Sequence, residues 1–116
     1  MTDDTDWLTV PDFAEVLGIT PSQVRELIRE GHVLAVRRGE RQVMQIPAGV
    51  IVDGEDGPEV LATLRGTLTL LRDAGFDDAE SADWLLHEEA ELGMTPLAAL
   101  REGRRAHVRR IAQSLL

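Results

Sequence analysis

The chain of 116 residues contains no cysteine and no lysine, and it has only four aromatic side chains. Without cysteine, disulfide bonds and thiol chemistry are excluded. His32, His87 and His107 stand apart from one another and from carboxylates at ligand spacing, so we predict neither a metal site nor a cofactor. With so few aromatic residues, the core must consist mainly of Leu, Val, Ile and Ala.

Long apolar runs are missing as well. No segment approaches the length of a membrane span, and no basic segment followed by an apolar one leads the chain. We therefore expect a protein of the cytoplasm with no membrane contact. The many carboxylates are not accompanied by a nucleophile–base pair, a glycine-rich phosphate loop or a metal-ligand cluster. For that reason an enzyme is not expected.

The formal net charge of −9 is distributed unevenly. Residues 25–49 carry five Arg and three Glu, and residues 101–116 carry five Arg and one Glu. Residues 50–100 carry twelve acidic residues and two Arg. Acidic groups more than roughly 8 Å from a phosphate are largely screened at physiological salt. The local excess of Arg is therefore compatible with a modest affinity for nucleic acid.

Two short helices are predicted on either side of a glycine turn. Thr9 can cap the first helix and Gly18 ends it. Thr20 caps the second, Gln23 closes a capping box, and Gly31 ends the helix. The first helix carries one apolar stripe at the spacing i, i+3, i+4, i+7, formed by Val10, Phe13, Ala14 and Leu17.

The second helix, residues 20–30, is expected to expose a polar face. Val24, Leu27 and Ile28 are predicted to point inward. The outer face then consists of side chains that can reach base edges and phosphates: Ser22, Gln23, Arg25, Glu26 and Arg29. This layout is typical of a helix-turn-helix, in which the second helix enters the major groove of DNA.

A β-hairpin is predicted directly after these helices. Residues 33–38 and 41–46 are strand-like runs joined by Gly39 and Glu40, and a two-residue loop with glycine first suits a type II′ turn. Such a hairpin can serve as a wing over residues 33–46. Three arginines are expected at its tip, in reach of phosphates: Arg37, Arg38 and Arg41.

The sequences VPDFAEVLGITPSQVRELIREG (10–31) and AVRRGERQVMQIP (35–47) resemble the winged helix-turn-helix modules of the excisionase and MerR-like group. This resemblance implies double-stranded DNA as a partner.

Further along, Trp84-Leu85, Leu92-Gly93 and Thr95-Pro96-Leu97 are similar to the toxin-binding C-terminal domain of Xre-type antitoxins, although Met94 replaces a usual glycine. That second resemblance implies a protein partner at the C-terminal helices. The combination of both parts looks like a small actinobacterial family of DNA-binding proteins known from mycobacteria.

The rest of the chain is predicted to be mostly helical. Residues 50–52 could add a third strand to the wing before the turn at 53–57. Residues 60–64 could pair with that strand or begin a helix. We favour the helix because Leu61, Leu64, Leu68 and Leu71 keep a spacing of three or four, and it should end at Gly75. Further helices are predicted from Asp77 or Asp78, from Thr95 to Gly103, and over the last residues.

These patterns predict a mainly α protein with a small β-hairpin wing. We expect a disordered acidic tail over residues 1–6, a winged helix-turn-helix DNA-binding module over 7–53, and a C-terminal helical subdomain over 54–116. Thr5, which lies between two Asp residues, is a candidate phosphorylation site.

The predicted function is sequence-specific or semi-specific DNA binding in transcription regulation. The alternatives are an antitoxin-like protein whose C-terminal helices bind a protein partner, and an excisionase-like architectural factor. Helix-turn-helix proteins often bind paired half-sites as dimers, so a homodimer is a further alternative for the oligomeric state.

Overall fold

The computed structural model describes residues 6–116, so the candidate site Thr5 lies outside the described residues. The first half contains β1 (Trp7–Thr9), α1 (Val10–Leu17), α2 (Pro21–Arg29), β2 (Val36–Arg38), β3 (Val43–Pro47) and the 3-10 helix η1 (Ala48–Val50). The second half contains β4 (Ile51–Gly54), β5 (Gly57–Val60), α3 (Leu64–Asp73), α4 (Asp78–Leu86), α5 (Pro96–Arg101) and α6 (Arg105–Gln113).

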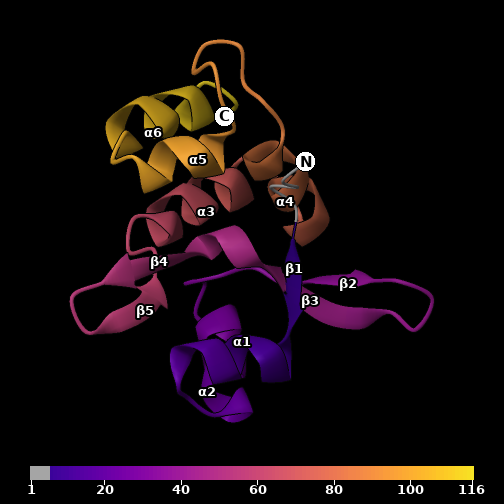
Figure 1. The fold of residues 1–116 in the computed structure, drawn as a ribbon. Coiled ribbons are helices and arrows are strands. Elements are labelled where there is room, and N and C mark those ends of the chain that lie inside the picture. Colours follow the sequence, from indigo (N-terminus) through magenta and orange to yellow (C-terminus); the bar gives the residue numbers. More distant parts are fainter. Residues whose placement is uncertain (1–5) are drawn as a thin grey trace.

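The elements form three layers, which Figure 1 shows from the side. Helices α1 and α2 lie at the bottom, the strands lie in the middle, and α3, α5 and α6 lie on top. The β2–β3 and β4–β5 hairpins project to opposite sides of the molecule (Figure 1). This arrangement confirms the predicted fold, a winged helix-turn-helix followed by a helical C-terminal part.

The helix boundaries of the helix-turn-helix follow from local capping. The Thr9 hydroxyl accepts a hydrogen bond of 3.3 Å from the Asp12 N–H, and Gly18 ends α1 in the left-handed conformation. At α2 the Thr20 hydroxyl accepts from the Gln23 N–H at 3.1 Å, while the Gln23 side chain accepts from the Thr20 N–H at 2.9 Å. The capping box predicted for Thr20 and Gln23 is therefore confirmed.

Removing this cap should cost stability. Thr20→Ala leaves the first N–H groups of α2 without their side-chain acceptor, and we expect the free energy of unfolding to fall by about 1 kcal/mol. Chemical denaturation followed by circular dichroism measures it. Thr20→Ser keeps the acceptor and should stay close to the parent protein; an equal loss in both variants would contradict the capping role.

The predicted two-residue wing turn is wrong. Strands β2 and β3 are joined by four residues, Gly39–Gln42, and both Gly39 and Gln42 have positive φ, 79° and 54°. The loop closes on the Gly39 carbonyl, which accepts from the Gln42 main-chain N–H at 3.2 Å and from its Nε2 at 2.9 Å. The side-chain amide of Gln42 thus stabilises a longer loop, and Arg41 lies in this loop instead of in a strand.

The prediction for the third strand is also wrong. The partner of the wing is β1, in the sheet order β1-β3-β2, with Trp7 opposite Pro47. Residues 51–54 pair instead with β5 in a separate antiparallel hairpin, so that residue 60 ends a strand and α3 begins only at Leu64. We predicted Asp6 to belong to the disordered tail. Its main-chain carbonyl instead accepts a hydrogen bond of 2.8 Å from the Ala48 N–H.

The later helices begin where the sequence indicates. Asp77 caps α4 in a capping box with Glu80, and Thr95 caps α5 through a bond of 3.0 Å from the Ala98 N–H. Gly103 follows the end of α5 in the left-handed conformation. Within residues 6–116, no helix combines the length and the apolar character that crossing a bilayer requires.

One hydrophobic core runs through both halves of the chain. It joins side chains such as Phe13, Leu34 and Ile46 to Leu68 and Leu100, all of which are fully buried. The boundary predicted after Asp53 falls inside β4.

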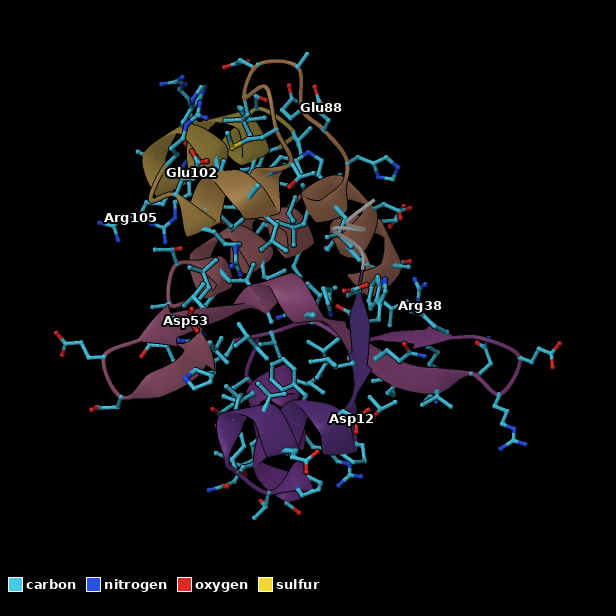
Figure 2. All side chains as sticks on the ribbon, viewed as in Figure 1. Asp12, Arg38, Asp53, Glu88, Glu102 and Arg105 are labelled. Carbon is cyan, nitrogen blue, oxygen red and sulfur yellow. The ribbon has the colours of Figure 1, made fainter. Side chains whose placement is uncertain are left out.

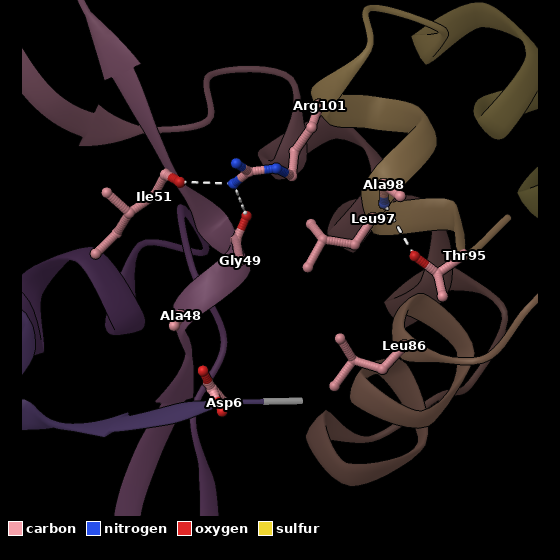
Figure 3. A pocket seen from close by; sticks show the side chains of 9 residues that line it. All are labelled: Asp6, Ala48, Gly49, Ile51, Leu86, Thr95, Leu97, Ala98 and Arg101. Carbon is pink, nitrogen blue, oxygen red and sulfur yellow. Dashed lines mark hydrogen bonds between the residues drawn. The ribbon is translucent and has the colours of Figure 1, made fainter. Parts of the chain in front are cut away.

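The seam between the halves is polar in part. Arg101 Nη1 of α5 donates to the carbonyls of Gly49 and Ile51, each at 2.7 Å (Figure 3). Leu97 packs over Gly49, where an added Cβ would stand 2.9 Å from its Cδ2. The C-terminal helices are therefore packed directly on the end of the winged module.

Candidate nucleic-acid interface

The exposed face of α2 consists of two polar stripes. Ser22, Arg25 and Arg29 share one stripe at the spacing i, i+3, i+7, and Gln23, Glu26 and Glu30 share the adjacent one. All six side chains are exposed, whereas Val24 beneath them is fully buried. The outward-facing residues predicted for this helix are therefore all at the surface.

The stripe of Arg25 and Arg29 borders a groove between α2 and the wing. Its floor is apolar, and it is formed by Val10, Pro11, Ile28, Val43 and Met44. Val43 is 41% exposed, which is unusual for a large apolar side chain of this protein. The guanidinium groups on one wall give this side of α2 a positive charge.

The stripe of Glu26 and Glu30 borders a second groove, between α2 and the β4–β5 hairpin. Glu59 of β5 lies on its other side, together with Pro58 and Val60. The same hairpin carries further exposed acids at Asp53, Glu55 and Asp56, of which Asp53 is labelled in Figure 2. The side of α2 that faces this hairpin is therefore anionic, and the side that faces the wing is cationic.

An ion pair connects the two stripes. Arg29 Nη2 lies 2.8 Å from Glu26 Oε2, and the side chains are 68% and 60% exposed. Exposed pairs of this kind contribute little to stability, about 0–1 kcal/mol. Arg29 can therefore exchange its carboxylate partner for a phosphate or a base at low cost.

The three wing arginines do not share one surface. Arg37 and Arg38 are consecutive in β2 and so point to opposite faces of the sheet. The Arg38 guanidinium stacks over the Trp7 ring, with its Cζ 4.1 Å from the ring centroid. Figure 2 labels Arg38 beside β1. Arg37 Nη1 donates to the Gln42 carbonyl at 3.4 Å, which ties it to the loop. The exposed Arg41 lies in that loop.

Three features of this surface were not predicted from the sequence. They are the stacking of Arg38 on Trp7, the apolar floor at Val43 and Met44, and the anionic hairpin beside α2. Each depends on which strands pair, because β1 brings Trp7 to the wing and the β4–β5 pairing brings Glu59 to α2. The run Trp7-Leu8-Thr9, which ends at the cap of the first helix, was the available signal for β1.

Comparison with known proteins gives a consistent result along the chain. A family model described as the wHTH domain of DNA-binding protein Rv2175c matches residues 1–50. A second one, described as the Rv2175c C-terminal domain of unknown function, matches residues 61–115. The two domains follow one another in the order that the fold shows.

A curated relative and a solved structure agree with these matches. DNA-binding protein Rv2175c of Mycobacterium tuberculosis (strain ATCC 25618 / H37Rv) is 35% identical over 89 residues, 74% of this chain. The match spans 56% of that relative. The NMR structure of Rv2175c has a TM-score of 0.82 and 31% identity, over 99% of this chain and 84% of that one. The chain therefore belongs to the Rv2175c family, which confirms the resemblance to an actinobacterial winged helix-turn-helix group.

Proposed function

We propose that this protein binds duplex DNA and regulates transcription, with α2 in the major groove and the wing on the phosphates. The observation that carries the proposal is the stripe of Arg25 and Arg29 on the side of α2 that faces the wing. The name of the relative, a DNA-binding protein, supports it. Among the site residues, Ser22 at the start of α2 would reach base edges, where recognition helices make their contacts, whereas the side-chain oxygen of Gln23 is engaged in the capping box.

The charge pattern supports one direction of approach. DNA on the wing side of α2 would meet Arg25, Arg29 and Arg41, whereas DNA on the other side would meet Glu30 and Glu59. Base-edge contacts by Arg go mainly to guanine, and phosphate contacts fix the register. Because few arginines face this side, few phosphates would be neutralised and the affinity would be modest.

The direct test is a fluorescence anisotropy titration of the full chain with a pool of random-sequence duplexes at several salt concentrations. Binding should weaken linearly in a log–log plot against salt, with a slope of about −0.9 per neutralised phosphate. Selection of the bound duplexes from the same pool then identifies the preferred sequence. Absence of binding at low salt would reject the proposal.

The wing arginines should differ in their effects. Arg41→Ala removes an exposed loop cation, and we expect it to reduce the magnitude of the salt slope by roughly 0.9 while weakening all sequences alike. Arg38→Ala removes the stacking on Trp7, which contributes about 0.5–1 kcal/mol at an exposed site, and it should mainly lower stability. Salt titrations and denaturation of both variants separate these roles. A changed sequence preference in Arg41→Ala would argue against a phosphate contact.

A further inference from the structure

Two arginines of the C-terminal half reach the end of α2. Arg65 and Arg72 are seven residues apart in α3, which is about two helical turns and places them on one face. Arg65 Nε donates a hydrogen bond of 3.2 Å to the main-chain carbonyl of Glu30, the C-cap residue of α2. The Arg72 guanidinium lies over Gly31, where an added Cβ would stand 2.9 Å from its Nη1.

The last carbonyls of a helix lack partners within that helix, and at the end of α2 several of them accept from groups outside the helix. The carbonyls of Glu26, Leu27 and Ile28 accept from the N–H groups of the turn that follows. The Glu30 carbonyl accepts from the Arg65 side chain. Because the C-terminal end of a helix carries a partial negative charge, the guanidinium also stabilises this end electrostatically. Helix α3 therefore ties the last turn of α2 to the C-terminal helices.

A constraint at this end controls the position of the other end. Helix α2 has nine residues and is thus about 13 Å long, so a tilt of about 5° at Glu30 would move Ser22 by roughly 1 Å. Hydrogen bonds to base edges lose most of their strength over such a displacement. The phosphate contacts of the wing do not depend on this angle, because the wing is held by β1.

We infer that Arg65 is a positioning residue for sequence reading, which holds α2 at the angle where its outer face fits the major groove. The inference rests on the proposed function, because it concerns how the same surface meets DNA. It also gives the C-terminal half a role in DNA recognition that requires no DNA contact of its own. Arg72 has a supporting position over Gly31 and also lies 3.9 Å from Asp78.

The test compares Arg65→Met with Arg105→Met in the full chain. Methionine keeps an unbranched apolar chain similar to the stem of arginine and removes both the charge and the donor. Arg105 is an exposed arginine of α6 that controls for the lost charge. Affinity is measured for the duplex that the parent protein selects from a random pool and for a scrambled version of it. Arg65→Met should weaken binding to the selected duplex by about three- to tenfold, the range of one lost hydrogen bond, and leave the scrambled duplex and the salt slope unchanged.

Other readouts separate positioning from a phosphate contact and from lost stability. Arg65→Lys retains a cationic donor, so it should restore most of the discrimination between the two duplexes. Amide hydrogen exchange at Glu30, Gly31 and His32 should become faster in Arg65→Met and not in Arg105→Met, since the bond at Glu30 is lost only in the former. All titrations are made at a temperature where circular dichroism shows each variant fully folded.

Several results would overturn the inference. A salt slope flattened by roughly 0.9 in Arg65→Met, with equal losses for both duplexes, would show that Arg65 touches a phosphate instead. Unchanged discrimination in Arg65→Met would show that α2 is positioned without it. If the parent protein and Arg105→Met fail to bind any duplex, the proposed function itself fails, which is a separate outcome.

Discussion

Replacing Arg25 and Arg29 together by alanine should reduce DNA binding at physiological salt to the level of the scrambled duplex. Each single substitution should cost about 1–3 kcal/mol, the range for an arginine that contacts a guanine edge. The reason is that both side chains lie on the cationic wall of the groove between α2 and the wing. Anisotropy titrations of the two single variants and the double variant measure the effect.

Two further variants make this prediction sharper. Glu26→Gln breaks the ion pair with Arg29 and removes an acid from the exposed face of α2, so it should strengthen binding at low salt. Arg105→Ala removes one positive charge at a distance from α2 and should change affinity little. If Arg25→Ala and Arg29→Ala bind as tightly as Arg105→Ala at low salt, α2 is not the helix that meets DNA.

The helix-turn-helix could be predicted from the sequence because its signals are local. A cap, a first-turn proline and a terminal glycine act within one helical turn, so Thr20, Pro21 and Gly31 determine α2 almost independently of the rest of the chain. The apolar stripe of α1 is likewise contained in eight residues, and Val10, Phe13 and Ala14 are buried as expected.

The errors arose where strand pairing decides the structure. The apolar pattern of residues 51–54 does not distinguish pairing with the wing from pairing with residues 57–60. The turn at Glu55 and Asp56 favours the second, because it closes the shorter loop. The wing has a four-residue loop instead of the predicted two-residue turn because Gln42 adopts a positive φ, which is rare outside glycine. The Gln42 side chain stabilises that conformation. Neither choice has a signature in the spacing of apolar residues.

The charge division across α2 was visible in the sequence only in part. The alternating signs of Arg25, Glu26, Arg29 and Glu30 are local, and helical periodicity separates them into two stripes. That Glu59 would line the anionic side depends on the β4–β5 hairpin, which brings this residue back to α2 from a distant part of the chain. The direction from which DNA would approach is therefore a property of the tertiary structure.

A fragment that ends at Asp53 should fail to fold. It lacks β5 and all helices from α3 onward, and it would expose Leu34, Ile46 and Val50, which are buried in the full chain. Each large apolar side chain that loses its burial costs about 1.5–3 kcal/mol, and a small domain has only about 5–15 kcal/mol in total. These losses, together with the two bonds from Arg101, are comparable to the whole stability of a small domain.

Circular dichroism and denaturant unfolding of this fragment give the result, with a second fragment ending at Val60 as the comparison. The longer fragment keeps the β4–β5 hairpin intact but still lacks the C-terminal helices. Both should show little cooperative unfolding, because they lack core side chains of the C-terminal helices such as Leu68 and Leu100. If the fragment ending at Asp53 unfolds cooperatively and binds DNA as tightly as the full chain, the winged module is independent. In that case the C-terminal helices contribute nothing to the position of α2.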